Sequence, residues 1–265
     1  MKKSFLKSLT AVSALVCATS ASAGFINIGG INMPTGGHFE VASIYENVVT
    51  GVGQELKGVG EVTSINGFAT NTLCAGCELT YRFEGYIVTS ITPTSITFSG
   101  GTIRFYLGFG ADNDFNPFTS GGSAADIAAA GNGTLFLTLA GHAIDAAGNT
   151  FAGSGNNIGS PNAAGNGAGL ADVVAGGGIA TNFFDTDSIT ALFGPAFADF
   201  QIGSSFSNVL LSPAQRAECN ANPFAPLCLA GSADMRGLVI PEPGSLTLAG
   251  LALLGLGSIA RRRRS

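Results

Sequence analysis

The residues with the clearest potential for chemistry lie in the segment Asp112-Asn113-Asp114-Phe115-Asn116, where oxygen-bearing side chains occupy alternate positions. Calcium takes many oxygen ligands, and Asp-x-Asp-x-Asn resembles the start of a calcium loop. Pro117 stands where an EF-hand loop needs glycine, and no glutamate follows at the closing position. The segment therefore predicts a partial calcium site formed by Asp112, Asp114 and Asn116, with a solvated turn as the alternative.

Catalytic groups are harder to find. The two histidines, His38 and His142, have no nucleophile beside them in a motif such as Gly-x-Ser-x-Gly. Paired carboxylates can cleave a glycosidic bond, but nothing in their spacing selects a pair here. The candidate pairs are Asp185 with Asp187, and Glu78 with Glu84. We expect no catalytic residues and no enzymatic activity, with calcium as the one cofactor that the pattern allows.

The cysteines favour an oxidising compartment and two structural disulfides. Four of them lie in the body of the chain, which allows three connectivities; we favour Cys74–Cys77 and Cys219–Cys228 because each pair is close in sequence. A redox Cys-x-x-Cys should open a helix, whereas the residues after Cys77 have a strand pattern. The spacing of the second pair is too wide for a typical structural zinc site.

Two-residue alternation predicts strands through most of the body, and it is clearest in residues 79–88. There Leu79, Tyr81 and Phe83 lie on one side and polar residues on the other. The further predicted strands cover residues 38–45, 60–65, 95–98, 102–107, 134–139, 198–202 and 205–210.

The connections between these strands contain glycine. Residues 99–101 and Gly203 predict hairpin turns. Residues 148–169 are rich in Gly, Ala, Asn and Ser and have few apolar residues, which predicts a long surface loop.

One short helix is predicted near the C-terminal end of the body. Ser212 is a suitable N-cap, Pro213 suits the first helical position and Gln215 completes a capping box. The helix should end near Cys219. Together the segments predict an all-β fold, an antiparallel β-sandwich or jelly roll with this one helix, and an irregular β-barrel as the alternative.

The N-terminal residues 1–23 have the pattern of a secretory signal peptide. A basic stretch with three lysines precedes an apolar, Ala-rich core. Ala21 and Ala23 fit the small-x-small cleavage pattern, so Gly24 should begin the exported domain, residues 24–240.

The C-terminal residues 241–265 have three parts. Pro241, Glu242 and Pro243 disfavour helix and keep the stem extended. Residues 244–260 form an uncharged apolar run at the short limit for a transmembrane helix. An arginine cluster follows and should remain on the cytoplasmic side. The cluster consists of Arg261, Arg262, Arg263 and Arg264.

These residues closely resemble the PEP-CTERM sorting signal, which combines Pro-Glu-Pro, a short helix rich in Gly, Leu and Ala, and a terminal arginine cluster. The resemblance implies a Gram-negative bacterium and processing by an exosortase, a membrane cysteine transpeptidase. It also implies release to the cell surface or into an exopolysaccharide matrix. A plain C-terminal anchor is the alternative.

The charge of the exported part differs from that of the whole chain, which is −5. Seven of the 12 basic residues lie in the signal peptide and the arginine cluster, so residues 24–260, with Glu242 of the stem included, have five basic against 17 acidic residues, a net charge of −12. Such a surface repels nucleic acid and anionic lipid. The chain has no Trp, which weakens a typical sugar-stacking platform.

From these features we expect an exported, exosortase-processed protein of the cell surface or extracellular matrix. Its role would be structural or adhesive, in exopolysaccharide, biofilm or floc formation. A calcium-dependent or carbohydrate-binding module and a matrix-acting hydrolase are the alternatives. The expected partners are exosortase, the Sec translocon and exopolysaccharide, with membrane contact through the C-terminal helix before processing and no nucleic acid.

Overall fold

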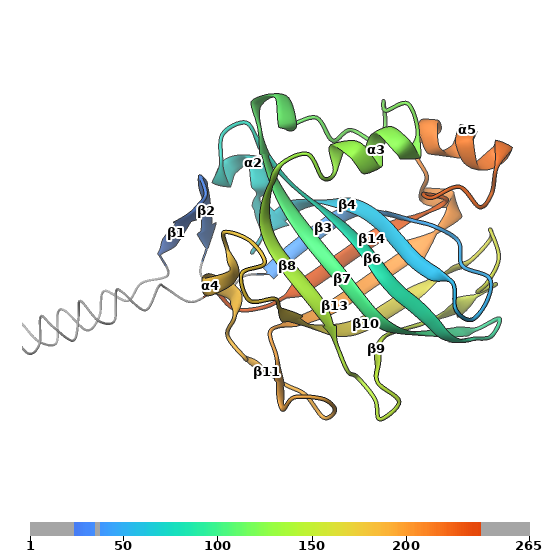
Figure 1. The fold of residues 1–265 in the computed structure, drawn as a ribbon. Coiled ribbons are helices and arrows are strands. Elements are labelled where there is room, and N and C mark those ends of the chain that lie inside the picture. The colour runs from blue at the N-terminus through green and yellow to red at the C-terminus, as the bar shows by residue number, and fades with distance from the viewer. Residues whose placement is uncertain (1–23, 35–37, 240–265) are drawn as a thin grey trace, which may run out of the picture.

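Long antiparallel strands form the body of the molecule (Figure 1), which is known from a computed structural model that describes residues 24–34 and 38–239. The strands are β1 (Phe25–Ile28), β2 (Ile31–Pro34), β3 (His38–Glu46), β4 (Glu55–Ile65), β5 (Phe68–Ala69), β6 (Cys77–Ile91), β7 (Ser95–Phe109), β8 (Thr134–His142), β9 (Asn149–Asn156), β10 (Ala164–Val173), β11 (Ile189–Thr190), β12 (Phe197–Ala198), β13 (Phe200–Ser207) and β14 (Leu229–Arg236). The helices are α2 (Thr70–Leu73), α3 (Ser123–Ala129), α4 (Thr181–Phe184) and α5 (Pro213–Ala221), with 3₁₀ turns η1 (Gly110–Asp112) and η2 (Asn208–Leu210).

The main sheet closes on itself. Its strands follow the order β13-β14-β3-β4-β6-β7-β8-β10, and β10 then pairs with β13 from Ala164↔Ser207 to Ala171↔Phe200. Strands β8 and β9 share one position in this circle, because β8 pairs with one half of β7 and β10, and β9 pairs with the other half. The prediction of an all-β antiparallel fold is confirmed. Its two curved halves face each other across a common core, as the layers of a sandwich do.

The core follows from the alternation of the strands. On β6, Leu79, Tyr81 and Phe83 are all buried, as the pattern predicted. A cluster of phenylalanine rings fills one part of the interior, with Phe39 lying 5.4 Å from Phe105 and 5.4 Å from Phe184 between ring centroids. Large rings close the space between the two halves of the sheet without polar atoms that need partners.

Both predicted hairpin turns are wrong, because the glycines lie inside continuous strands. Strand β7 runs through residues 99–101, where Gly100 and Gly101 have φ values of 73° and 95° and bend the strand beside Gly85 of β6. A Cβ at Gly101 would lie 2.3 Å from the ring of Tyr86, so only a glycine at this position leaves room for the ring. Strand β13 likewise runs through Gly203.

The predicted surface loop at residues 148–169 is also wrong, since most of it forms β9 and β10. Its glycines allow the strands to approach closely: a Cβ at Gly165 would lie 2.2 Å from the carbonyl oxygen of Ser154. Strand pairing on both sides supplies the order that the side chains do not. A segment poor in apolar residues can therefore be a central strand when its neighbours provide the packing.

The predicted helix is confirmed as α5. The Ser212 hydroxyl accepts a hydrogen bond from the Gln215 N–H, and the Gln215 side chain accepts from the Ser212 N–H, which is a complete capping box. The sequence did not predict α3, which lies next to α5 over the outer face of the sheet (Figure 1). Beneath the two helices a second apolar cluster includes Tyr45 and Leu211.

Candidate functional site

The interior of the closed sheet contains two adjoining cavities, each of about 40 Å³. Four residues line both of them: Glu46, Leu56, Phe151 and Ser204. The rest of the first cavity is lined by Ile44, Tyr81, Phe83, Tyr86, Ile103, Ile202, Ala233 and Met235. A mostly apolar cavity with a few polar groups is the usual form of a small-molecule site.

Among the residues that the structure describes, Glu46 is the only charged one that lines either cavity. It is the last residue of β3, and alternation along that strand places it on the same face as Ile44, with Tyr45 on the opposite face under α3 and α5. Only 7% of Glu46 is exposed. The sequence pattern does not predict this position: the predicted strand ends at residue 45, and alternation from the buried Phe39 would place Glu46 on the opposite face. The register of β3 against β4 shifts between Glu40 and Ser43, and this irregularity brings Ile44 and Glu46 to the interior.

The Glu46 carboxyl group forms no hydrogen bond or ion pair with any other described residue. Burial without a compensating partner raises its pKa from 4.5 to about 8. Glu78 provides a contrast within the same protein: it is also buried, which raises its pKa to about 7, but its Oε2 accepts a hydrogen bond of 2.9 Å from the Phe115 N–H. The Glu46 carboxyl is thus the less compensated of the two.

Aromatic rings form part of the lining of the first cavity. Ring centroids lie 6.3 Å apart for Tyr81 and Phe83, 6.4 Å for Phe83 and Tyr86, and 5.9 Å for Tyr86 and Phe151. Burial raises the pKa values of both tyrosines, so their hydroxyls stay neutral. The first cavity thus combines one potential anion with several aromatic rings, whose faces attract cations.

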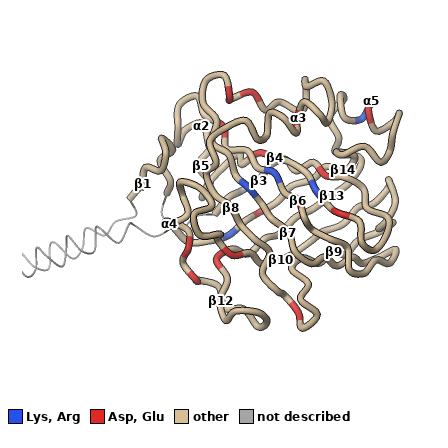
Figure 2. The backbone as a smooth tube through the Cα atoms, in the orientation of Figure 1, with Lys and Arg blue, Asp and Glu red and all other residues tan. Residues whose placement is uncertain are grey.

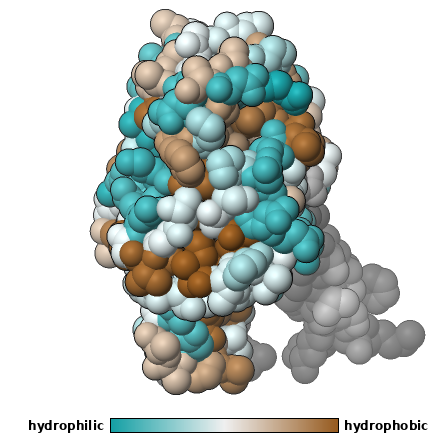
Figure 3. All heavy atoms as spheres, turned by 90° about the vertical axis from the view of Figure 1, so that its right-hand side faces the viewer, coloured by the Kyte–Doolittle hydropathy of each residue, from teal (hydrophilic) through white to brown (hydrophobic). Residues whose placement is uncertain are grey.

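A groove of about 360 Å³ lies beside α5 and the Cys219–Cys228 disulfide. Its lining includes Asn162, Asn208 and Cys228, the immediate or near neighbours of cavity residues Ala163, Phe206 and Leu229. Figure 3 faces the right-hand side of Figure 1, where hydrophobic residues gather in separate places with hydrophilic residues between them. Exposed apolar side chains near the groove are Val209, Leu210 and Phe224.

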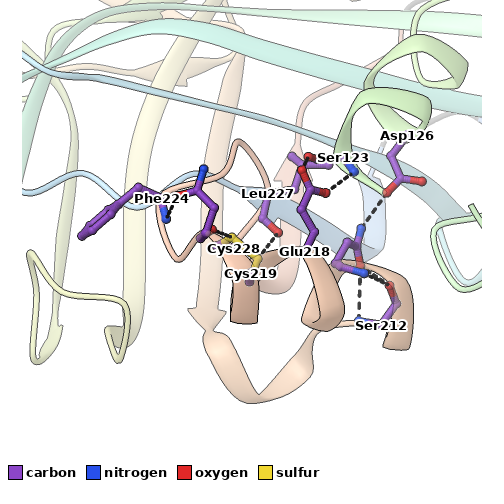
Figure 4. The surroundings of a disulfide bond; sticks show 10 residues. Ser123, Asp126, Ser212, Glu218, Cys219, Phe224, Leu227 and Cys228 are labelled. Atoms are coloured by element: carbon purple, nitrogen blue, oxygen red, sulfur yellow. Dashed lines mark hydrogen bonds between the residues drawn. A yellow bond between two sulfur atoms is a disulfide. The ribbon is translucent and has the colours of Figure 1, made fainter. Parts of the chain in front are cut away.

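Both predicted disulfides are present, Cys74–Cys77 and Cys219–Cys228, with Cα–Cα distances of 5.7 and 5.6 Å. Cys77 begins β6, in agreement with the expectation that a strand follows it. The second disulfide joins the end of α5 to the residue before β14 (Figure 4).

Around this disulfide, buried polar contacts join α5 to α3 (Figure 4). The Ser123 N–H and hydroxyl donate to the Glu218 carboxylate at 2.6 and 2.5 Å. The Gln215 amide donates to Asp126 Oδ2 at 2.9 Å, and burial raises the pKa of Asp126. The contacts fix the two helices to each other on the outer face of the sheet.

The predicted calcium residues Asp112, Asp114 and Asn116 are all exposed and lie in the turn after β7. Asp114 accepts a hydrogen bond of 2.9 Å from the side chain of Asn132, and the Asn116 carbonyl accepts from the Ser120 N–H at 3.0 Å. Calcium binding by this turn stays a prediction.

The structure brings Asp185 and Asp187 together with Asp199, so that one ligand oxygen of each lies within 4.8 Å of the others. Figure 2 shows acidic positions gathered around α4 and β12. Both carboxylate oxygens of the buried Asp199 accept hydrogen bonds, from the backbone N–H groups of Val173, Thr186 and Asp187. This carboxylate therefore has a structural role in holding the loop.

The other predicted acidic pair is not brought together. Glu78 and Glu84 both lie on β6, six positions apart. Glu78 is buried, whereas Glu84 is exposed and forms an ion pair with Arg104 of β7. At about 3.4 Å per residue they stand on the order of 20 Å apart along the strand, beyond the ~5–10 Å that two carboxylates need to act on one glycosidic bond.

His142 has an ordered, buried place at the end of β8. Its Nδ1 lies 2.9 Å from Asp172, and its Nε2 lies 2.9 Å from the carbonyl oxygen of Phe193. Both ring nitrogens are therefore used to hold the segment after α4 against the sheet. His38 begins β3.

Three predicted features lie outside the described residues: the signal cleavage residues Ala21 and Ala23, the Pro-Glu-Pro stem with its apolar run at 244–260, and the arginine cluster. Within residues 24–34 and 38–239, no helix has the length and apolar character needed to cross a membrane.

Comparison with known proteins bears on the C-terminal segment. Residues 239–264 match the family model described as the PEP-CTERM protein-sorting motif. No curated protein and no solved structure matches the chain. The match confirms the resemblance stated above for residues 241–264 and indicates a C-terminal anchor that exosortase processes. The chain is therefore an exported protein that carries a PEP-CTERM sorting motif and is targeted to exosortase.

Proposed function

We propose that the protein acts outside the inner membrane, at the cell surface or in the extracellular matrix, in a structural or adhesive role without enzymatic activity. The setting would be exopolysaccharide, biofilm or floc formation. The observation that carries the proposal is the sorting motif at residues 239–264, which follows directly after the closed sheet.

The route to that place has three steps in this proposal. The Sec translocon exports the chain and residues 1–23 are removed. Residues 244–260 then anchor the domain, with the arginines on the cytoplasmic side. Exosortase finally processes the Pro-Glu-Pro stem and frees residues 24–240 from the anchor.

Two features of the exported domain, its disulfides and its charge, support a function outside the cell. Two disulfides stabilise it where no reducing system protects free thiols. The Cys219–Cys228 bond lies shortly before β14, the last strand before the sorting motif, so it holds the region next to the stem. The excess of acidic residues keeps the exported part soluble and away from anionic lipid.

Intact mass spectrometry of the protein from envelope and medium tests the route. We expect a chain that starts at Gly24, ends near Pro243 and gains about 4 Da on reduction of two disulfides. A matched variant with alanine at Pro241, Glu242 and Pro243 should keep Arg261 to Arg264. A wild-type chain that also keeps those arginines would contradict processing and the matrix role that depends on it.

The role itself needs a separate test. A strain that lacks the protein should form weaker flocs or biofilm, and the wild-type gene should restore them. The alanine stem variant should fail to do so. Full restoration by a chain that stays anchored would show that release into the matrix is not needed.

A further inference from the structure

At its position, Glu46 lowers the stability of the folded protein. An unpaired carboxyl group in an apolar interior loses its hydration without gaining a partner, and an apolar side chain of similar volume would be more stable there. The mature chain has cations that could have paired with it, but they lie elsewhere. Lys57 pairs with Glu55, and Arg104 pairs with Glu84, both at the surface.

The position of the carboxyl group indicates a partner from outside the chain. Glu46 is more than nine-tenths buried, lines both interior cavities and has no partner among the described residues. The same cavity is lined by the aromatic rings of Tyr81, Phe83, Tyr86 and Phe151, together with aliphatic side chains. Aromatic faces attract cations, and a carboxylate adds a full negative charge to the same attraction.

We propose that the interior of the closed sheet binds a small organic cation, a primary or secondary ammonium group on a compact apolar body, with Glu46 as its counter-ion. The ammonium N–H groups would donate to the carboxylate, and the apolar body would lie against the aromatic rings. The same site disfavours anions, because no described basic side chain lines either cavity.

The size of the cavities limits the ligand. A water molecule needs roughly 10–15 Å³ of cavity volume. Each cavity of about 40 Å³ therefore has room for a group of only a few heavy atoms. The two cavities meet at Glu46, Leu56, Phe151 and Ser204, so a short ligand can place its charged end there and extend into either one.

Binding should also release a proton. Near pH 7 the Glu46 carboxyl is largely protonated, because its pKa is raised to about 8. An ammonium ligand that pairs with the carboxylate must displace that proton into the solvent. A neutral ligand that accepts a hydrogen bond from the protonated acid releases none, so proton release separates the two chemistries.

Isothermal titration calorimetry of the exported chain with n-butylammonium and n-butanol tests the proposal. At pH 7, in buffers of different ionisation enthalpy, we expect binding of n-butylammonium with release of close to one proton, and much weaker binding of n-butanol. Glu46→Gln should lower the affinity for n-butylammonium on the order of ten- to a hundredfold. Glu61→Gln is the matched control, since Glu61 is half-buried with a raised pKa but lines neither cavity.

Several results would overturn the proposal: no heat of binding with n-butylammonium, equal affinity for n-butanol, binding without proton release, or the same affinity in Glu46→Gln as in wild type. Circular dichroism of each variant checks that the closed sheet is intact. The outcome is independent of sorting, because a chain that is exported and processed can still fail to bind the cation.

Discussion

The Glu46 carboxyl group makes the stability of the protein depend on pH. Its pKa is about 8 in the folded state and near the ordinary 4.5 in an unfolded chain, so the folded chain binds this proton more tightly between those values. Its contribution to stability is fully present below about pH 4.5 and is lost as the pH rises through about 8. Glu78, with its pKa raised to about 7, acts in the same direction.

We therefore predict that Glu46→Gln leaves stability nearly unchanged at pH 5 and raises it at pH 9. The expected gain at pH 9 is on the order of 2–4 kcal/mol in the free energy of unfolding, because the amide avoids the buried charge. Urea unfolding at the two pH values measures it. Glu84→Gln, which changes an exposed carboxylate, should show no such pH-dependent gain. Equal effects of Glu46→Gln at both pH values would contradict the raised pKa.

The predicted calcium turn is also tested residue by residue. If Asp112 and Asp114 bind calcium, replacing both with alanine should lower the melting temperature only when millimolar calcium is present. Differential scanning calorimetry with calcium, magnesium or a chelator measures this. The same scans on a variant with asparagine at Asp185 and Asp187 would show whether any calcium effect belongs to the other acidic group. A melting temperature that calcium does not change would rule out the prediction.

At the scale of elements, the two disulfides stabilise different connections. The Cys219–Cys228 bond closes a loop with a sequence separation of 9 and ties α5 to β14, whereas Cys74–Cys77 closes a loop with a separation of 3 before β6. Closing a longer loop removes more conformational entropy from the unfolded chain, so the disulfide with the longer loop stabilises the folded state more.

The double serine variant at Cys219 and Cys228 should thus lose roughly 2–3 kcal/mol, and the one at Cys74 and Cys77 about 2 kcal/mol. Guanidinium unfolding compares them. Hydrogen exchange should show faster opening of α5 in the first variant alone, since its contacts to Ser123 and Asp126 depend on where the helix is held. The same exchange rates in α5 with and without the bond would show that the contacts to α3 suffice.

Elements also show where local patterns fail. Residues 99–101 and Gly203 have the composition of turns, but the pairing of β7 with β6 and of β13 with β14 keeps each strand continuous. Gly203 is paired on both sides, with Ala168 of β10 and Asp234 of β14, whereas Gly100 is paired with Tyr86 of β6 and lies between the residues that pair with β9 and β8. Short-range turn preferences are weak compared with such long-range strand pairing. The helix α5, by contrast, was predictable because its capping box is a local contact between Ser212 and Gln215.

At the scale of the whole molecule, closure of the sheet depends on the pairing of β10 with both β9 and β13. We predict that Gly165→Ala destabilises the protein on the order of 1–3 kcal/mol, because the new Cβ would meet the carbonyl oxygen of Ser154 at 2.2 Å and must push β9 away. Gly203→Ala on β13 is the control, since nothing lies within 4 Å of its added Cβ. Urea unfolding that ranks the two variants equally would contradict the close packing of this seam.

The sequence by itself determined that the protein is exported and targeted to exosortase, and it determined the type of fold. The sorting motif, the all-β alternation, the α5 cap and the two cysteine pairs are local patterns, and each depends on residues that are close along the chain. The sorting motif, the all-β fold and the disulfides are confirmed by comparison or by the structure.

Only the tertiary structure decided that the sheet closes, that residues 148–169 form strands, and that Glu46 stands alone in an apolar cavity. Each of these depends on residues far apart in the sequence. The pairing of β10 with β13 joins residues 29 (Ala171↔Phe200) to 43 (Ala164↔Ser207) positions apart, and the first cavity draws its lining from β3, β4, β6, β7, β9, β13 and β14. A glutamate at a strand end has many ordinary roles; its burial among aromatic rings, which raises its pKa, exists only once the sheet has closed around it.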